Sequence, residues 1–267
     1  MAPVRRVGDR GDERCALKLA WIDASTAQEA LVLAVWDGRR CTPARSRSAA
    51  GALLLERLDA QRSLRDLPVG AAIVIAGRLL RRLAIPAPTG VRTLTDHAAD
   101  MDRLLRARWA QLGRPFGRRL LDAVLETARS AKHSQERLLV NWDLHYENVL
   151  AGEREPWLVI DPKVVAGDPA FGLAQLLWTR LEEIEDGSGV DHVFQLLVEA
   201  AEIDPISARA WTILRLVDYW LWALSVGFTE DPALRDPGGP ASLTLDPGQV
   251  GEIRSRRCAC RRCGWGG

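Results

Sequence analysis

Apolar positions recur with two different spacings along the chain, and this change of spacing predicts an α+β protein. Residues 15–21 form a short, mostly apolar run that is typical of a strand, and residues 52–59 form a second run that ends in charge. Residues 70–84 instead place apolar side chains at helical intervals and stop before Pro86. The first third of the chain therefore predicts strands followed by a long helix.

Helical spacing dominates the rest of the chain. Further helices are predicted, in chain order, at residues 25–36, 95–131 with a break at 113–115, 173–184, 192–202 and 208–227. Thr95 is the expected N-cap of the second of these. Segments 1–14, 39–51 and 231–250 follow neither period and are expected to be irregular.

A short hairpin interrupts the helices and carries an unusual density of polar groups. Its predicted strands are residues 148–151 and 157–161, joined by a turn that contains Gly and Pro. The hairpin places Asn148 beside Asp161, and their amide and carboxylate oxygens are hard ligands that suit Mg²⁺. Asp143 lies five residues before Asn148 in the entering loop, where a free carboxylate can accept a proton from a hydroxyl.

This division of roles is the one that phosphoryl transfer requires. The alternative is that Asp143 and Asp161 are only turn and strand-end residues. The combination of D-x-x-x-x-N, a hairpin and a following I-D-P favours the catalytic interpretation, because the three groups have the relative spacing found in kinases.

Composition narrows the class of protein further. The 267 residues are 47% hydrophobic, which is enough for a sizeable core. The 27% of charged residues balance to a net charge of +1, so a nucleic-acid or membrane-surface binder is not indicated, and a small polar or cationic ligand is favoured. Neither a bilayer-spanning run nor a signal peptide is apparent, and a cytoplasmic location is expected.

The five cysteines do not form a disulfide framework. Cys258, Cys260 and Cys263 make a terminal C-x-C-x-x-C that could bind zinc, but a fourth ligand is not nearby. Lysine is rare: the chain contains only Lys18, Lys132 and Lys163. Lys18 stands in an apolar strand, where its ammonium group needs a buried anion, unless the side chain reaches solvent at a strand edge.

The segment "NWDLHYENVLAGEREPWLVIDP", with "GDPAFGL" after it and "ALKLAW" and "LLLERLD" before it, resembles the aminoglycoside/hydroxyurea antibiotic resistance kinases. Within that family the resemblance is greatest to the streptomycin 6-phosphotransferases, and it covers about residues 15–250. It implies a protein-kinase-like fold of two lobes, with ATP and Mg²⁺ bound between a shortened N-terminal β lobe and a mostly helical C-terminal lobe. It also implies transfer of the γ-phosphoryl group to a hydroxyl of an aminoglycoside.

The resemblance assigns roles by position. Asp143 would be the catalytic base, and Asn148 and Asp161 would be the magnesium ligands. Lys18 would contact the α- and β-phosphates of ATP, and Glu29 in the following helix would pair with it.

The family pattern also implies the division into lobes. The segment "LERLD" matches the hinge, where backbone groups near Glu56 and Leu58 would hold adenine. The N-terminal lobe with the hinge would then span residues 1–58, the C-terminal lobe residues 59–250, and an irregular tail residues 251–267.

A polycationic antibiotic requires an acidic pocket beside Asp143. Glu147, Asp168 and the acidic run at 182–186 are candidates for it. His145 belongs to the catalytic-loop motif, and a structural hydrogen bond is its expected role.

The sequence departs from the family in several places. Only seventeen residues precede Lys18, so the phosphate-covering hairpin is expected to be largely missing, and segment 39–51 replaces an apolar strand. We hypothesise that segments 1–14, 39–51 and 251–267 come from a shifted reading frame or a misplaced start.

Two motif positions also differ from the family. Asn141 stands where the family has His, and Gly172 replaces an Asp that braces the catalytic loop, so the loop geometry is expected to loosen. A non-catalytic kinase remnant and a kinase for hydroxyurea or another small metabolite are the alternatives to an aminoglycoside kinase. The oligomeric state is left open.

Overall fold

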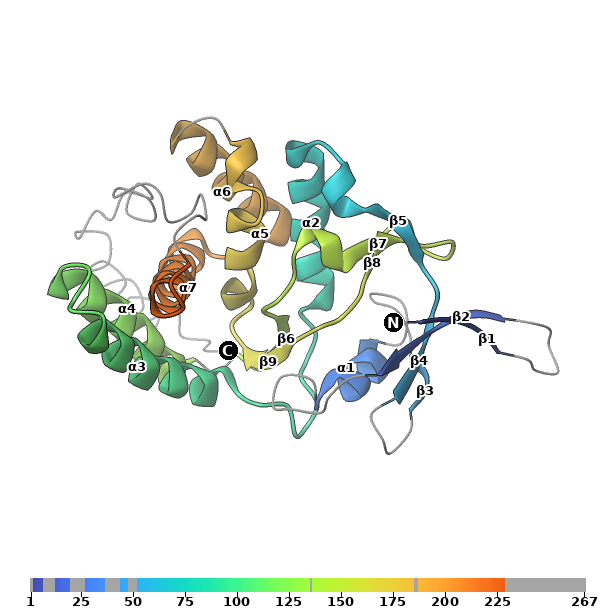
Figure 1. Cartoon of the computed structure of the whole chain (residues 1–267), viewed down its shortest axis with the longest axis horizontal. Coiled ribbons are helices and arrows are strands. Elements are labelled where there is room, and N and C mark those ends of the chain that lie inside the picture. The colour runs from blue at the N-terminus through green and yellow to red at the C-terminus, as the bar shows by residue number, and fades with distance from the viewer. Residues whose placement is uncertain are drawn as a thin grey trace, which may run out of the picture.

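The computed structural model of the chain describes residues 2–6, 13–19, 27–36, 44–47, 52–134, 136–184 and 187–228 (Figure 1). At one side lies a four-stranded antiparallel sheet in the order β1-β2-β4-β3, made of β1 (Ala2–Arg6), β2 (Glu13–Leu19), β3 (Ala44–Arg47) and β4 (Ala52–Glu56). Helix α1 (Glu29–Trp36) follows β2. The arrangement confirms the α+β class.

The first and third strands correct the expectation of an irregular N-terminal region. β1 pairs with the lysine strand β2, with Val4 opposite Cys15, so a strand is present where irregular chain was expected. It is the single described strand ahead of β2, so a two-stranded hairpin before the lysine strand is not seen among the described residues. β3 lies within the segment 39–51 and pairs with β4. Both are outer strands of the sheet, and an outer strand needs no continuous apolar pattern because one of its edges is unpaired. This is why the sequence pattern did not reveal them.

Two smaller sheets carry the central hairpin. β5 (Asp59–Ser63), β7 (Val149–Ala151) and β8 (Leu158–Val159) form one sheet in the order β5-β7-β8, and β6 (Leu138–Asn141) pairs with β9 (Val164–Gly167) in the other. The predicted strand at 52–59 is wrong in its second half, because the chain leaves the first sheet after Glu56 and enters the second at Asp59. β9 was not predicted at all.

Helices build most of the rest of the described fold, and all but α5 have at least 13 residues. They are α2 (Val69–Leu83), α3 (Leu94–Gln111), α4 (Arg118–Ser130), α5 (Ala174–Trp178), α6 (Gly187–Ala201) and α7 (Pro205–Ser225). The predicted helix at 173–184 is wrong in length, since α5 ends at Trp178 and a 3-10 turn, Leu181–Glu183, follows. Thr93, not Thr95, caps α3, and its side chain accepts a hydrogen bond from the Asp96 amide at 3.1 Å.

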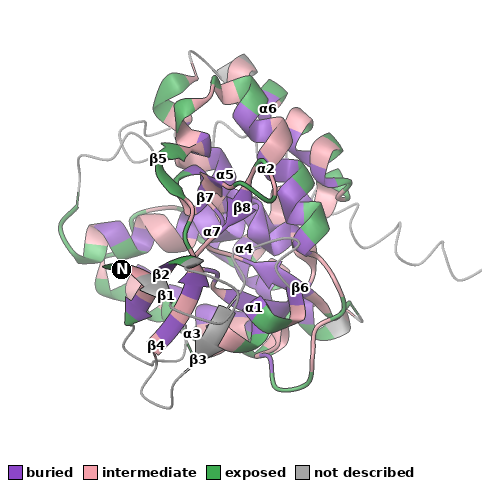
Figure 2. Ribbon diagram, turned by 90° about the vertical axis from the view of Figure 1, so that its right-hand side faces the viewer, coloured by how far each residue is buried: buried purple, intermediate pink, exposed green. Residues whose placement is uncertain are grey.

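A continuous hydrophobic core joins the four-stranded sheet to the helices, as the buried residues in Figure 2 show. Trp36 on α1 is fully buried, and its indole N–H donates to the Leu83 carbonyl at the end of α2 over 3.0 Å. Gln28, just before α1, donates to the Gly90 carbonyl at 2.6 Å. These contacts fix the position of α1 relative to the helical part of the molecule.

An aromatic cluster holds α3 and α7 against the catalytic segment. His97 of α3 lies with its ring centroid 5.6 Å from Trp142 and 5.4 Å from Phe171. The buried Arg215 guanidinium of α7 lies 5.4 Å and 5.0 Å from the same two rings. Because Trp142 directly precedes Asp143, this cluster positions the segment that carries the candidate base.

The close approach of α2 and α6 depends on Gly77. A methyl group at this position would lie 2.7 Å from the Ala200 Cβ and 3.1 Å from the Leu197 carbonyl oxygen. We expect Gly77→Ala to lower the free energy of unfolding by about 1–3 kcal/mol, since this overpacking outweighs the helix propensity of alanine. Gly70→Ala on the same helix has no atom within 4 Å and is the matched control, expected to be neutral or stabilising. Urea unfolding that ranks the two variants in the opposite order would contradict this packing.

His97 makes stability sensitive to acid. Burial lowers the pKa of His97 to about 4, and the cations of Arg92 and Arg215 add to this effect while Asp100 opposes it. Because an unfolded histidine titrates near 6.5, the unfolded chain binds a proton between about pH 6.5 and 4 that the folded chain does not. Stability should therefore fall as the pH drops through this window, by about 2 kcal/mol from this residue at pH 5. Urea unfolding at pH 7.5 and pH 5 should show a smaller loss in His97→Gln than in wild type, and an unchanged loss in the exposed control His192→Gln.

Candidate active site

A buried ion-pair cluster connects the four-stranded sheet to the central hairpin. Lys18 on β2 is only 8% exposed, and its Nζ donates to both carboxylate oxygens of Glu29 at 2.8 and 2.7 Å. Its second partner is the carboxylate of Asp161, which lies beyond β8. The predicted pairing of Lys18 with Glu29 is confirmed, and the alternative of a lysine that reaches solvent is wrong.

The cluster keeps Lys18 charged. Burial lowers the pKa of Lys18, but its hydrogen bonds to Asp161 and Glu29 more than reverse this effect, and the pKa is raised above its ordinary value. Asp161 adopts a left-handed backbone with φ of +50°, a conformation that Asp tolerates better than most residues. A cation and two carboxylates therefore meet where the two parts of the fold come together.

Asn148 and Asp161 lie at the same end of the hairpin. The Ile160 amide donates to the Asn148 carbonyl at 2.9 Å, which brings the residue before Asp161 against Asn148. Asn148 is not on the first strand as predicted, because it ends a 3-10 turn, Tyr146–Asn148, immediately before β7. An amide oxygen and a carboxylate are among the donor types that Mg²⁺ takes in nucleotide sites.

Asp143 forms an ion pair that the sequence analysis missed. Its Oδ2 lies 2.6 Å from the Nζ of Lys163, and the two side chains are 16% and 32% exposed. Lys163 follows Asp161 by two residues and is one of only three lysines in the chain. This rarity, next to a candidate metal ligand, could have identified it as a site residue. The candidate base therefore has an ammonium group directly beside it, carried on the flexible side chain of a lysine.

Asn141 ties these two residues together. Its Oδ1 accepts the backbone N–H groups of both Asp143 and Lys163, each at 3.2 Å. The Trp142 amide donates to the Lys163 carbonyl at 3.0 Å and adds a third link. Asn141 is fully buried, and its Nδ2 has no hydrogen-bond partner among the described residues. The expectation that asparagine at this position loosens the loop stays a prediction.

Gly172 and Arg215 complete the support behind the loop. A methyl group at Gly172 would lie 2.8 Å from the Asn141 carbonyl oxygen, so glycine permits a close approach of the two backbones. Arg215 donates to the carbonyls of Trp142 at 2.6 Å and Phe171 at 3.3 Å. Burial lowers the pKa of Arg215 to about 10, while Asp143 and Asp218 oppose this, so the guanidinium stays charged near neutral pH. An arginine inside the apolar run of α7 was the sequence signal that went unused.

The expected hinge residues lie where β4 passes toward β5. The Glu56 carboxylate is held by Arg154 of the hairpin turn, with Nη2 at 2.9 Å. Leu58 is half-buried, and its Cδ2 would lie 3.3 Å from a methyl group at Gly152. Both side chains fasten the hinge to the hairpin, and the adenine contact of this backbone stays a prediction.

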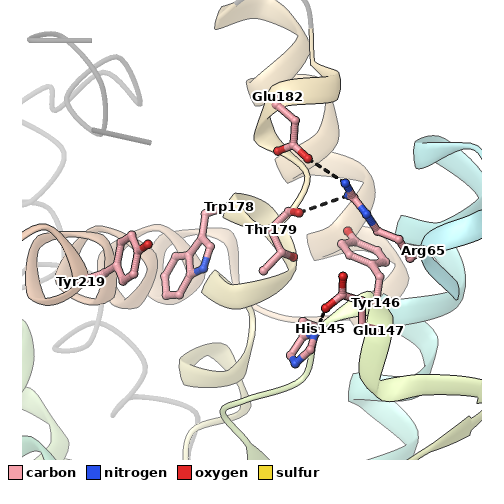
Figure 3. Close-up of a pocket in the computed structure, with 8 residues that line it drawn as sticks. All are labelled: Arg65, His145, Tyr146, Glu147, Trp178, Thr179, Glu182 and Tyr219. Carbon is pink, nitrogen blue, oxygen red and sulfur yellow. Dashed lines mark hydrogen bonds and ion pairs between the residues drawn. The ribbon is translucent and has the colours of Figure 1, made fainter. Parts of the chain in front are cut away.

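The acidic residues expected beside Asp143 fall into two groups. Asp168 has a structural role, because it accepts hydrogen bonds from the Ala170 amide at 2.9 Å, the Ser207 hydroxyl at 2.6 Å and the Trp211 indole at 3.2 Å. Glu147 and Glu182 instead line an open cavity of about 360 Å³ (Figure 3). The rest of its lining is Arg65, His145, Tyr146, Trp178, Thr179 and Tyr219. His145 lies 3.9 Å from Glu147, and the hydrogen bond expected of it stays a prediction.

Within the described ranges, the structure brings together no group of three or more His, Cys, Asp or Glu side chains that could hold a metal. Cys258, Cys260 and Cys263 lie outside these ranges, as do residues 231–250 and the tail. None of the helices described is both long and apolar enough to cross a bilayer.

The sequence matches known proteins along most of its length. Residues 3–227 match the family model described as aminoglycoside/hydroxyurea antibiotic resistance kinase. A hydroxyurea phosphotransferase of Kitasatospora aureofaciens is 42% identical over 218 residues, which are 79% of this chain and 63% of that protein. A streptomycin 6-kinase of Streptomyces glaucescens is 39% identical over 231 residues, 82% of this chain and 74% of that protein. This chain thus spans less than two thirds of the first relative.

Solved structures support the same fold. A thermostable mutant of the aminoglycoside phosphotransferase APH(4)-Ia superposes with a TM-score of 0.56 at 15% identity, covering 95% of both chains. An ethanolamine kinase of Plasmodium vivax has a TM-score of 0.57 at 12% identity, covering 94% of this chain and 76% of the other. The predicted kinase-like fold is confirmed, and the chain belongs to the aminoglycoside/hydroxyurea antibiotic resistance kinase family.

Proposed function

We propose that this protein uses ATP to phosphorylate a hydroxyl group of streptomycin or a related aminoglycoside, and thereby confers resistance to the antibiotic. The observation that carries the proposal is the convergence of Lys18, Asp161 and the Asp143–Lys163 pair at one end of the hairpin. Phosphoryl transfer needs cations for the phosphates and a carboxylate for the acceptor, and this end of the hairpin offers both.

On the nucleotide side, Lys18 would bind the α- and β-phosphates while Glu29 holds its ammonium group in place. Asn148 and Asp161 would hold Mg²⁺, which neutralises phosphate charge when it is bound. The backbone near Glu56 and Leu58 would hold adenine. Because ATP is the donor, a cytoplasmic site of action is part of the proposal.

On the acceptor side, the oxygen of the substrate hydroxyl would attack the γ-phosphorus as the bond to the β-phosphate oxygen breaks and ADP leaves. Asp143 would take the hydroxyl proton. The Lys163 ammonium would move from Asp143 to the γ-phosphoryl oxygens, which frees the carboxylate and counters the transferred charge. Asn141 would keep the two residues in register during this exchange.

Hydroxyurea is the second candidate acceptor, because the relative at 42% identity is named for it. The third hypothesis, a non-catalytic remnant, required a missing N-terminal lobe. The four-stranded sheet and the Lys18–Glu29 pair argue against that hypothesis.

Asp143→Asn keeps the shape of the side chain but removes the proton acceptor. We expect it to lower the rate of phosphate transfer from labelled ATP to streptomycin by about 10²–10⁴-fold. Asp122→Asn, on the exposed face of α4, is the control and should leave the rate unchanged. Wild-type folded protein that transfers no phosphate to streptomycin, or an Asp143→Asn variant as fast as wild type, would sink the proposed reaction.

Asn141→Leu removes the oxygen that joins the Asp143 and Lys163 amides. Two partly buried N–H groups then lose their acceptor, so the free energy of unfolding should fall by about 1–3 kcal/mol. We expect kcat to fall by about 100-fold, since a shift of roughly 1 Å in the base is enough for this loss. The KM for ATP should change little, because Lys18 is untouched. Steady-state kinetics in which KM for ATP rises while kcat holds would assign Asn141 to the nucleotide side instead.

A further inference from the structure

A single peptide unit connects the proposed base to an arginine of α7. The carbonyl of Trp142 and the N–H of Asp143 belong to the same planar group and point in opposite directions. Arg215 Nη1 donates to that carbonyl at 2.6 Å, and the N–H donates to Asn141 Oδ1 at 3.2 Å. Both ends of the unit are therefore held, one from α7 and the other from β6. These two hydrogen bonds fix the rotation of the peptide plane from which the Asp143 side chain starts.

The Arg215 guanidinium is itself held in one orientation. It is only 7% exposed, and its Cζ lies 5.4, 5.0 and 5.2 Å from the ring centroids of Trp142, Phe171 and Trp178. It also donates to the Phe171 carbonyl and to the Gln175 side-chain oxygen, each at 3.3 Å. Because a guanidinium group is planar and its donors have fixed directions, these contacts leave it little freedom to turn. Arg215 therefore presents a fixed donor to the loop.

The charge of Arg215 has no ion-pair partner in the part of the chain that the structure describes. Its hydrogen-bond acceptors are all uncharged oxygens, and the carboxylates of Asp143 and Asp218 act on it only from a longer distance. A buried cation without a directly bound counter-ion is costly. An apolar side chain would fill the same space without that cost, so stability alone does not account for an arginine at this position.

We infer that Arg215 is a positioning residue for phosphate transfer: through the Trp142 carbonyl it sets the direction in which Asp143 presents its carboxylate to the acceptor hydroxyl. The inference rests on the proposed function, in which Asp143 takes the hydroxyl proton. The Lys163 ammonium lies 5.7 Å from the centroid of the Trp142 ring. Rotation of the Trp142 peptide would therefore disturb the Asp143–Lys163 pair as well as the base.

Arg215→Met keeps a long apolar side chain but removes the charge and the N–H donors. We expect kcat with streptomycin to fall by about 10–100-fold while the KM for ATP holds, because the base shifts and Lys18 is untouched. The urea midpoint of unfolding should change little, since a costly buried charge is lost together with its hydrogen bonds. Arg209→Met is the control on the same helix, where Arg209 pairs with Asp191 at 3.6 Å, and it should keep the wild-type kcat. A wild-type kcat in Arg215→Met, or a fall in kcat that only matches a loss of folded protein, would overturn the inference.

Hydrogen exchange at the Asp143 amide, followed by NMR, separates this inference from the proposed function because it needs no phosphate transfer. Without Arg215 only one end of the peptide unit is held, so this amide should exchange several-fold faster in Arg215→Met than in wild type, and at the wild-type rate in Arg209→Met. An unchanged exchange rate in Arg215→Met contradicts the positioning role. Faster exchange in a protein that phosphorylates no antibiotic removes only the proposed function. Wild-type phosphate transfer by Arg215→Met removes only the positioning role.

Discussion

The ion pairs of Lys18 are the interaction on which the rest of the candidate site depends. Lys18 comes from the four-stranded sheet, Glu29 from the helix after it and Asp161 from the central hairpin, so one ammonium group joins three separate elements. A buried cation is stable only when it is well paired, and breaking such a pair typically costs about 3–5 kcal/mol. The sheet is thus held against the hairpin by the same group that would meet the phosphates. A nucleotide that draws Lys18 toward its phosphates would act on this junction directly.

Asn141 performs a similar task on the acceptor side at shorter range. Its single side-chain oxygen accepts hydrogen bonds from two backbone N–H groups. One belongs to Asp143 in the loop, and the other to Lys163, directly before β9. Gly172 lets the backbone after β9 come close enough to pack on Asn141, and Arg215 fastens the carbonyl of Trp142 from the other side. The two positions at which the sequence was expected to depart from the family pattern, 141 and 172, therefore lie against each other directly behind the loop that carries Asp143.

The sequence predicted those elements whose pattern lies within one short stretch of the chain. α2 and α7 are long, periodic segments, and their positions were predicted within a few residues because helical spacing is a local property. β1 and β3 were not predicted because an edge strand of a sheet needs no distinctive apolar pattern. β9 was not predicted because four residues are too few to show a pattern. The roles of Lys163 and Arg215 were missed for another reason. Their importance lies in contacts with Asp143 and Trp142 across 20 and 73 positions of the chain, and spacing along a sequence does not encode such contacts unless a motif is known beforehand.

The two sides of the site also differ in how freely they can change. The nucleotide side consists of buried, mutually dependent groups: Lys18 is 8% exposed and Glu29 is 3% exposed. The cavity beside the catalytic loop is instead lined by partly exposed ion pairs such as Arg65 with Glu182, and pairs of this kind contribute only about 0–1 kcal/mol to stability. Substitutions in the cavity should therefore cost little stability, whereas substitutions at Lys18 or Glu29 should cost much more.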